Sequence, residues 1–189
     1  MIYALVDKET LKQKGVSLKI LLQHISTFPN IPILQYRNKR ASLEEKKEDL
    51  EIIQAHYDGQ LIINDNVELI AYADGLHLGQ EDLRAYSHDL NEAVNLVRQK
   101  IGTKLLGLST HDKDEILEAN TLDLDYIGLG AYRATDTKSE ANVGGKTLLE
   151  VAKHSKHPVG IIGGVRLDDI FEEPIVYKVI GSGLYNGIE

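Results

Sequence analysis

Residues 104–130 read KLLGLSTHDKDEILEANTLDLDYIGLG. The apolar run Lys104–Leu108 ends in the polar residues Ser109–His111, and a second apolar run follows at Tyr126–Gly130. Between them, Asp112–Asn120 predicts a helix. The apolar runs are continuous rather than alternating, which is typical of parallel strands that are covered on both faces. This stretch therefore predicts one strand–helix–strand unit of an α/β fold.

The same unit recurs along the rest of the chain. Further strands are predicted at Ile2–Val6, Ile31–Tyr36, Leu61–Ile63, Leu76–Leu78, Val159–Ile162 and Val176–Ile180. Further helices are predicted at Ser17–Ile25, Ser42–Tyr57, Asp89–Val97 and Lys146–His154, with about two turns each at Asn66–Ala73 and Leu167–Glu172. Capping boxes are expected for Ser42 with Glu45 and for Asp89 with Glu92. Eight strands with helices between them predict a (β/α)8 TIM barrel, as a single domain over residues 1–189.

The predicted barrel is compact, and its last unit is short. The chain has 189 residues, fewer than the ~250 that are usual for this barrel. It ends at Glu189, soon after the eighth predicted strand, so the last helix is expected to be short or missing. Two alternatives stay open at this point. Either a partner subunit covers that face in a homo-oligomer, or the barrel wall is thin there.

Composition narrows the classes of protein. The chain has no cysteine, which rules out disulfides, cysteine–zinc sites and iron–sulfur sites. Its formal net charge is -8 and no basic face is evident in the sequence, which argues against a nucleic-acid partner. No run approaches the roughly 18 apolar residues of a membrane span, and Met1–Asp7 is too short for a signal peptide. The sequence predicts a cytoplasmic protein without a nucleic-acid or membrane partner.

Cationic residues follow the second predicted strand. In a parallel barrel all strands end at one rim, so the polar residues that follow them converge there. Alternation places Gln35, Arg37 and Lys39 on one side of the strand end. A guanidinium and an ammonium in that spacing could hold a diphosphate. A solvated strand end explains the pattern equally well.

Carboxylates follow the third and fourth predicted strands. Asn64-Asp65 comes directly after the buried run Leu61–Ile63, and Asp82 follows the next strand. Mg²⁺ prefers one or two carboxylates together with phosphate oxygens, so the two acids suit a magnesium site. Helix capping is the alternative for both. His77 lies inside a strand, where a hydrogen-bonded core histidine is favoured over a ligand contact.

Groups suited to bind phosphate follow the later strands. Ser109 could donate to a phosphate at the start of the next helix or could simply cap that helix. The loop Thr135-Asp136-Thr137-Lys138 has two hydroxyls and an ammonium, which suit an anion site, although a surface loop is the plainer interpretation. Gly163-Gly164 and Gly181-Ser182-Gly183 end the last two strands, where barrels often bind phosphate through backbone N–H groups.

Taken in order, these blocks resemble the thiamine phosphate synthase family, and the match spans nearly the whole chain. The blocks that carry the resemblance are QYRNK at 35–39, ND at 64–65, ADGLHLGQED at 73–82, GLSTH at 107–111, DYIGLG at 125–130, TDTK at 135–138 and GG at 163–164. The resemblance implies a Mg²⁺-dependent transferase with two small phosphorylated substrates. It would join a hydroxymethylpyrimidine diphosphate to a thiazole phosphate: pyrophosphate leaves first, and the thiazole nitrogen then attacks.

The resemblance also implies roles for individual residues. Asp65 and Asp82 would bind Mg²⁺. Arg37, Lys39, Ser109 and Lys138 would be catalytic, by stabilising the departing diphosphate. The implied substrate-binding residues are Gln35, Tyr36, Arg37, Asn38, Lys39, Asn64, His77, Ser109, Thr135, Asp136, Thr137, Lys138, Gly164, Ile180, Gly181 and Ser182.

The chain departs from the family in places, and two other functions stay open. Gly181 stands where the family usually has a serine, and the segment before the eighth strand is short. The related thiazole tautomerase shares the fold and works without metal, and His111 resembles its acid/base residue. That relative generally lacks the Asn-Asp and Gln-Glu-Asp blocks that this chain keeps. A non-catalytic barrel that binds thiamine phosphates is the third alternative, and the two acids favour the synthase over it.

Overall fold

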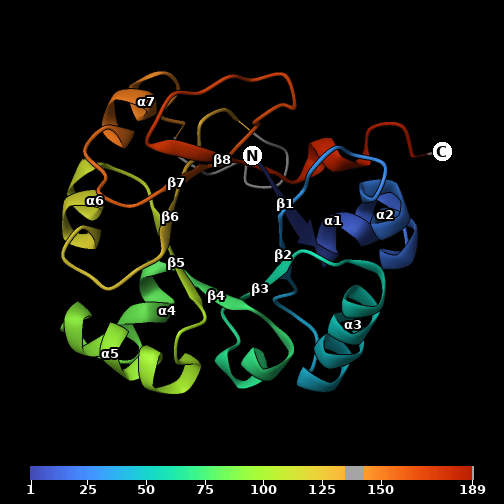
Figure 1. The fold of residues 1–189 in the computed structure, drawn as a ribbon, viewed down its shortest axis with the longest axis horizontal. Coiled ribbons are helices and arrows are strands. Elements are labelled where there is room, and N and C mark those ends of the chain that lie inside the picture. Colours follow the sequence, from blue (N-terminus) through green and yellow to red (C-terminus); the bar gives the residue numbers. More distant parts are fainter. Residues whose placement is uncertain (135–142, 189) are drawn as a thin grey trace.

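The computed structural model of the protein describes residues 1–134 and 143–188 (Figure 1). Within these residues eight parallel strands form a closed barrel in chain order, and β8 returns to pair with β1. The predicted (β/α)8 barrel is therefore confirmed. Its strands are β1 (Ile2–Asp7), β2 (Ile33–Arg37), β3 (Gln60–Asn64), β4 (Gly75–Leu78), β5 (Leu105–Thr110), β6 (Tyr126–Leu129), β7 (Val159–Ile161) and β8 (Ile175–Ile180).

Helices surround most of the barrel, and their starts follow the capping residues in the sequence. The helices are α1 (Lys8–Lys14), α2 (Leu18–Ile25), α3 (Leu43–His56), α4 (Gln80–Arg84), α5 (Leu90–Ile101), α6 (Lys113–Ala119) and α7 (Thr147–Ala152), with 3-10 turns η1 (Val67–Tyr72) and η2 (Ser182–Tyr185). The capping box of Ser42 and Glu45 is complete. The one expected for Asp89 is only half formed: Asp89 caps the Glu92 N–H, but the Glu92 carboxylate accepts from Ser87 instead.

Helix α1 was not predicted, because its sequence has a single buried leucine and no apolar stripe. It forms for local reasons. The Asp7 side chain caps its first turn by accepting from the Thr10 N–H, and Gly15 ends it in the left-handed conformation, with φ of 64°. Leu11 then packs into the core. The helix begins directly where β1 ends, so Asp7 belongs to the rim of the barrel.

The short helix predicted at Leu167–Glu172 is wrong. The segment is a turn at residues 167–168 followed by irregular chain. Ile170 is 92% exposed, and Phe171 packs against the core beside Tyr132, so the apolar residues of the segment do not share one helical face. Its polar groups are used elsewhere: the Asp169 carboxylate accepts from the Arg166 N–H and from Arg133. In residues 162–174, all of which the structure describes, no helix connects β7 to β8.

The last unit of the barrel is short, as expected. After β8 the described chain contains only η2. Residues Val176, Tyr177 and Lys178 of β8 are partly exposed, whereas four of the six residues of the neighbouring strand β1 are buried. Both alternatives for this face, a covering partner subunit and a thin wall, stay predictions.

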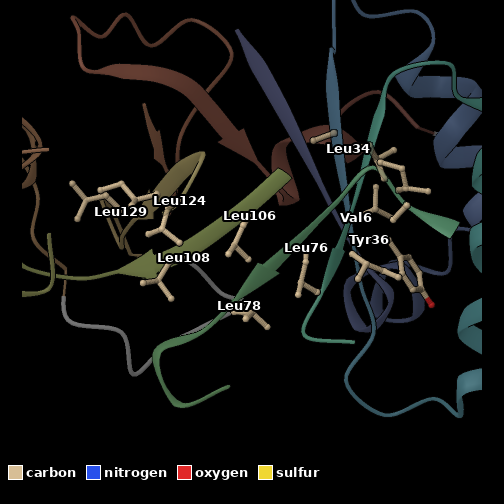
Figure 2. Close-up of a cluster of buried hydrophobic side chains, with 14 of the residues drawn as sticks. Val6, Leu34, Tyr36, Leu76, Leu78, Leu106, Leu108, Leu124 and Leu129 are labelled. Carbon is tan, nitrogen blue, oxygen red and sulfur yellow. The ribbon is translucent and has the colours of Figure 1, made fainter. Parts of the chain in front are cut away.

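Two apolar cores hold the barrel in place. Residues that point outward from the strands pack under the helices, and Figure 2 shows Val6, Leu34, Leu76 and Leu108 among them. Residues that point inward form a second, smaller cluster, made of Tyr3, Ile33, Ile62, Tyr126 and Val179. The alternation within each strand therefore decides which residues reach the barrel interior and the rim. No helix in the described part of the chain is long and apolar enough to cross a membrane.

Candidate active site

At the end of β2, alternate side chains point into the barrel and toward the surrounding helices, as predicted. Gln35 points inward, where its Nε2 donates to the hydroxyl of Tyr3 at 2.7 Å. Arg37 also points inward, and its Nη1 donates to the Asp7 carboxylate. Lys39 lies two residues beyond and is exposed at the rim. The predicted cationic pair is therefore at the mouth of the barrel.

The side chains of Tyr36 and Asn38 point away from the mouth of the barrel, toward α3. Tyr36 is buried on the outer face, and its hydroxyl donates to Asp49 of α3 at 2.6 Å. Asn38 donates to that same hydroxyl at 3.1 Å and accepts from the Arg40 and Ala41 N–H groups. The structure therefore assigns both side chains to holding the loop after β2. Their predicted contact with a substrate stays a prediction.

Two carboxylates and two cations come together at the ends of β2, β3 and β4. Burial raises the pKa of Asp65, and the neighbouring Asp82 carboxylate raises it further, while Lys39 and Arg37 lower it. Each of these charges lies close enough to influence Asp65. This convergence of residues from three different units is what the barrel rim was predicted to produce.

Asp65 adopts an unusual backbone conformation, with φ of 64°. Residues other than glycine rarely adopt this left-handed conformation, and it is found preferentially at functional sites. The Asp65 N–H donates to the carbonyl of His77 at 3.0 Å, which fixes the turn against β4. The backbone is therefore held so that the carboxyl group stays at the rim.

Helix capping does not explain the two acids. The residue at the N-cap of α4 is Gly79, which makes no side-chain cap bond, and Asp82 lies in the first turn. Its carboxylate folds back over Gly79, where an added Cβ would lie 2.7 Å from Asp82 Oδ2. The N-cap of η1 is Asn66, again without a side-chain cap bond. Among the described residues neither carboxylate is therefore engaged in a side-chain cap bond at the start of η1 or α4.

A chain of hydrogen bonds runs through the barrel interior to Ser109. The Tyr3 hydroxyl, which accepts a hydrogen bond from Gln35, lies 2.8 Å from the Tyr126 hydroxyl. Tyr126 is bonded to Nδ1 of His77 at 3.0 Å, and Nε2 of His77 is bonded to Ser109 Oγ at 3.0 Å. His77 is thus the hydrogen-bonded interior histidine that the sequence favoured. The two tyrosines were missed, because only the closed barrel brings them together.

Burial sets the protonation of this chain. It lowers the pKa of His77 to about 4, so the imidazole is neutral near pH 7. It raises the pKa of Tyr3 and of Tyr126, so both phenols stay protonated. A neutral imidazole has one donor and one acceptor nitrogen, so His77 donates one of its two bonds and accepts the other.

Ser109 does not cap the next helix. The N-cap of α6 is Asp112, whose side chain accepts from the Glu115 N–H. Ser109 instead lies one residue before the end of β5, half-buried, with Oγ turned into the barrel toward His77. Its carbonyl accepts from Nε2 of Gln80 at 2.8 Å, which links β5 to the start of α4. His111 is more than half exposed and pairs with Glu115.

Two glycines follow β7, and Arg133 holds their loop in place. The sequence did not reveal this role of Arg133. Gly163 and Gly164 have φ of 99° and 57°, which side-chain-bearing residues rarely adopt. Nη1 of Arg133 donates to the Gly164 carbonyl at 2.9 Å. The same guanidinium binds Asp169 in a bidentate manner, at 2.6 and 2.9 Å. Arg133 therefore ties the end of β6 to the loop after β7.

The remaining predicted residues divide into three groups. Ile180 is buried at the end of β8, Gly181 is the N-cap of η2, and Ser182 is exposed at its start. Asn64 ends β3 and its side chain helps to lower the pKa of Asp65. Thr135, Asp136, Thr137 and Lys138 lie outside the described residues.

A divalent cation fits the two carboxylates. Among the described residues no cluster of three or more His, Cys, Asp or Glu gathers around one point. A cation held here would take oxygen ligands from Asp65 and Asp82 and fill its other positions with water or substrate oxygens. Mg²⁺ is typically bound in this manner, whereas zinc and calcium usually take more protein ligands.

These features define the class: a (β/α)8 barrel with a charged site at the carboxyl ends of its strands. The family model described as thiamine monophosphate synthase matches residues 2–173. The chain belongs to this family.

Curated relatives agree with this assignment. A protein from Caldicellulosiruptor bescii, named thiamine-phosphate synthase, is 39% identical over 150 residues, which are 75% of this chain and 64% of that protein. A protein of the same name from Persephonella marina is 36% identical over 171 residues, or 87% of this chain and 76% of that one. The match thus spans about two thirds to three quarters of each relative's length.

A solved structure shares the fold. Thiamine phosphate pyrophosphorylase from Pyrococcus furiosus superposes with a TM-score of 0.71 at 24% identity, covering 96% of this chain and 85% of that one. At this identity the likeness shows the barrel and its connectivity. The assignment to the family depends on the sequence matches.

Proposed function

We propose that the protein is a thiamine phosphate synthase. It would transfer a hydroxymethylpyrimidine group from its diphosphate to the nitrogen of a thiazole phosphate, and release pyrophosphate. The observation that carries this proposal is the convergence of Arg37, Lys39 and Asp82 around Asp65 at the rim. Membership of the family supports the same reaction.

The two cations provide the charge that the leaving group requires. The chain as a whole has a formal charge of -8, so an anionic substrate must be attracted by local positive charge. Arg37 offers a planar guanidinium, and Lys39 offers a mobile ammonium at the entrance. As the C–O bond to the diphosphate breaks, negative charge grows on the diphosphate oxygens, and both cations stabilise it.

The two carboxylates account for a metal requirement. Asp65 and Asp82 would otherwise repel a diphosphate, and their mutual repulsion already raises the pKa of Asp65. Asp65 and Asp82 would hold Mg²⁺, which would supply positive charge near the diphosphate oxygens. The carboxylates thereby become binding groups for the ion that accompanies the substrate.

Ser109 and the interior chain orient the reacting region. Ser109 Oγ is held by a neutral His77, so the hydroxyl stays in one place without competing ionisation. The half-buried position limits water near the breaking bond. The glycines after β7 offer backbone N–H groups for the second substrate's phosphate, and Arg133 holds that loop by the Gly164 carbonyl.

The test is pyrophosphate release by the purified protein with both substrates, first with Mg²⁺ and then with EDTA. Metal-dependent release accompanied by thiamine phosphate is the expected result. Metal-free isomerisation of a thiazole carboxylate phosphate would instead indicate the tautomerase, and binding without turnover would indicate a non-catalytic barrel.

Variants of the two acids test the metal assignment. Asp65→Asn and Asp82→Asn should each reduce Mg²⁺-dependent turnover at least about 100-fold while the fold survives. Asp114→Asn is the matched control, because it removes the same charge from an exposed position on α6. Near-normal rates in both acid variants would remove Asp65 and Asp82 from the metal site.

A further inference from the structure

We infer that Asp7 is a positioning residue that holds Arg37 in the orientation needed to bind the diphosphate. This inference rests on the proposed function of the rim. Asp7 is the last residue of β1 and lies directly beside Arg37 in the register of β1 and β2. It is only 6% exposed, although it carries a carboxylate. A buried carboxylate at the rim of an anion-binding site needs a reason, because its charge repels the ligand.

The Asp7 carboxylate is held rigidly. Its Oδ1 accepts from the Thr10 N–H at 3.0 Å and from the Thr10 hydroxyl at 3.1 Å. These two bonds fix the side chain at the start of α1. Its Oδ2 is thereby directed across to β2, where it accepts from Nη1 of Arg37. The start of α1 therefore serves as a fixed acceptor for one end of the guanidinium.

Arg37 keeps most of its donors for a ligand. A guanidinium has five N–H donors in one plane. Within the part of the chain that the structure describes, Arg37 donates one side-chain hydrogen bond, from Nη1 to Asp7. The remaining N–H donors of the guanidinium are therefore left for a ligand at the rim, and Asp7 sets the direction of the group.

Two roles for Asp7 predict opposite effects when its charge is removed. If Asp7 only neutralised Arg37, removing the carboxylate would make the rim more positive and would tighten binding of an anion. If Asp7 positions Arg37, removal frees a long side chain that must be ordered again when the ligand binds, and affinity falls. The fixed geometry of Asp7 and the shared rim favour the second role.

The outer face of the same junction provides a matched control. Lys8, the next residue, pairs with Asp49 of α3 at 2.9 Å, and Asp49 accepts from the Tyr36 hydroxyl. This pair joins α1 to the other side of β2, away from the mouth. Lys8→Met therefore breaks a neighbouring ion pair of similar kind without touching Arg37.

The experiment compares Asp7→Asn with Lys8→Met. Asparagine keeps the capping oxygen for Thr10 but cannot accept from Arg37 if its amide faces β2. Binding of inorganic pyrophosphate in the presence of Mg²⁺ would be measured by calorimetry on the full chain. We expect Asp7→Asn to weaken binding about tenfold, as for a charge-assisted hydrogen bond. Lys8→Met should leave binding unchanged.

A double-mutant cycle separates positioning from a general structural effect. In an Arg37→Gln background, Asp7→Asn should cause no further loss, since there is no guanidinium left to orient. In steady-state assays Asp7→Asn should change the KM for the diphosphate substrate and kcat, but not the KM for the thiazole phosphate. An equal loss in the Arg37→Gln background would mean that Asp7 acts on the fold.

The outcomes are distinguishable. Unchanged or tighter pyrophosphate binding by folded Asp7→Asn, with normal binding by the wild type, overturns the inference alone. No pyrophosphate binding by the wild type overturns the proposed function, and the inference with it. If Asp7→Asn does not fold, Thr10→Ala decides: it keeps the Asp7 charge and the backbone N–H bond to Oδ1 but removes the hydroxyl bond, and a two- to threefold weakening is expected, roughly the loss of one restraint. Full affinity in Thr10→Ala would then reject the positioning role.

Discussion

His77 Nε2 and Ser109 Oγ lie 3.0 Å apart in the barrel interior, and the opposite nitrogen of the same imidazole is bonded to Tyr126. The serine at the rim is thus connected to residues of β1, β2, β4 and β6. Because His77 has partners on both nitrogens and is buried, a second proton would remove one acceptor and place a charge in an apolar interior.

The stability of the protein should depend on pH through His77. Burial lowers its pKa from 6.5 to about 4, so the unfolded chain binds a proton more readily than the folded one. The stabilisation is complete above about pH 6.5 and is lost as pH falls toward about 4, by an amount on the order of 2–3 kcal/mol. Urea unfolding across this range would measure the loss. His77→Gln should flatten the curve, and His88→Gln, at an exposed position, should not. Parallel curves for wild type and His77→Gln would contradict this account.

Ser109→Ala should reduce catalysis without unfolding the protein. The hydroxyl is held by His77 near the end of β5, so its loss removes a donor from the proposed reacting region. We expect kcat to fall roughly 10- to 100-fold, as for one donor to a developing charge. Single-turnover measurement would show whether the chemical step changes. Ser26→Ala is the control, because that hydroxyl donates to a helix carbonyl on the surface. An unaltered chemical step would restrict Ser109 to a structural role.

Asp169→Asn should loosen the loop that follows β7. Arg133 lowers the pKa of Asp169 to about 2, which means that the folded state favours the carboxylate. The pair contributes on the order of 1 kcal/mol after allowance for solvent screening, present above about pH 4 and lost as pH falls toward about 2. The free energy of unfolding would be measured for the wild type and for Asp169→Asn at pH 7 and pH 3. The difference between the two proteins should be smaller at pH 3. Glu150→Gln, which breaks the exposed pair with Lys153, should have a smaller effect. Equal losses of unfolding free energy in the two variants would mean that the Arg133–Asp169 pair stabilises the protein no more than an exposed surface pair does.

Gly107→Ala should be one of the costlier small substitutions. An added Cβ would lie 2.2 Å from the ring of Tyr126 and 2.6 Å from His77 Nδ1, both fixed by hydrogen bonds. We expect a loss of roughly 3 kcal/mol and a lower kcat, since the interior chain must shift. Gly15→Ala separates backbone strain from crowding, because its φ is 64° and nothing lies within 4 Å. Its cost should be about 1 kcal/mol. Thermal unfolding of the two variants would test whether Gly107→Ala loses more stability than Gly15→Ala. The opposite result would show that the barrel interior can repack.

The parts of the fold that depend on local pattern were predictable. Continuous apolar runs indicate strands covered on both faces, and alternation correctly places Gln35 and Arg37 inward. Helix α1 was missed because it depends on one cap and one buried leucine. The helix at Leu167–Glu172 was predicted wrongly because the pattern could not reveal that Asp169 is bound to Arg133.

The site was predictable only to the extent that strand ends converge. Asp65 and Asp82 could be placed at one rim from topology alone. Asp7 and Tyr126 could not, since their importance arises from partners 30 and 123 residues away in the sequence. Such contacts become visible when the barrel closes, and no spacing in the sequence encodes them.

The absence of a helix between β7 and β8 affects how the protein opens. β7 has three residues, its pairing with β8 shifts register between Val159 and Gly160, and the outer face of β8 is partly bare. A closed barrel has no free edge, so the first pair of strands to separate creates two at once. The seam between β7 and β8 combines a short strand, a register shift and a partly exposed face, and the glycine loop follows β7 directly. We therefore expect partial unfolding and amide exchange to begin beside the glycine loop.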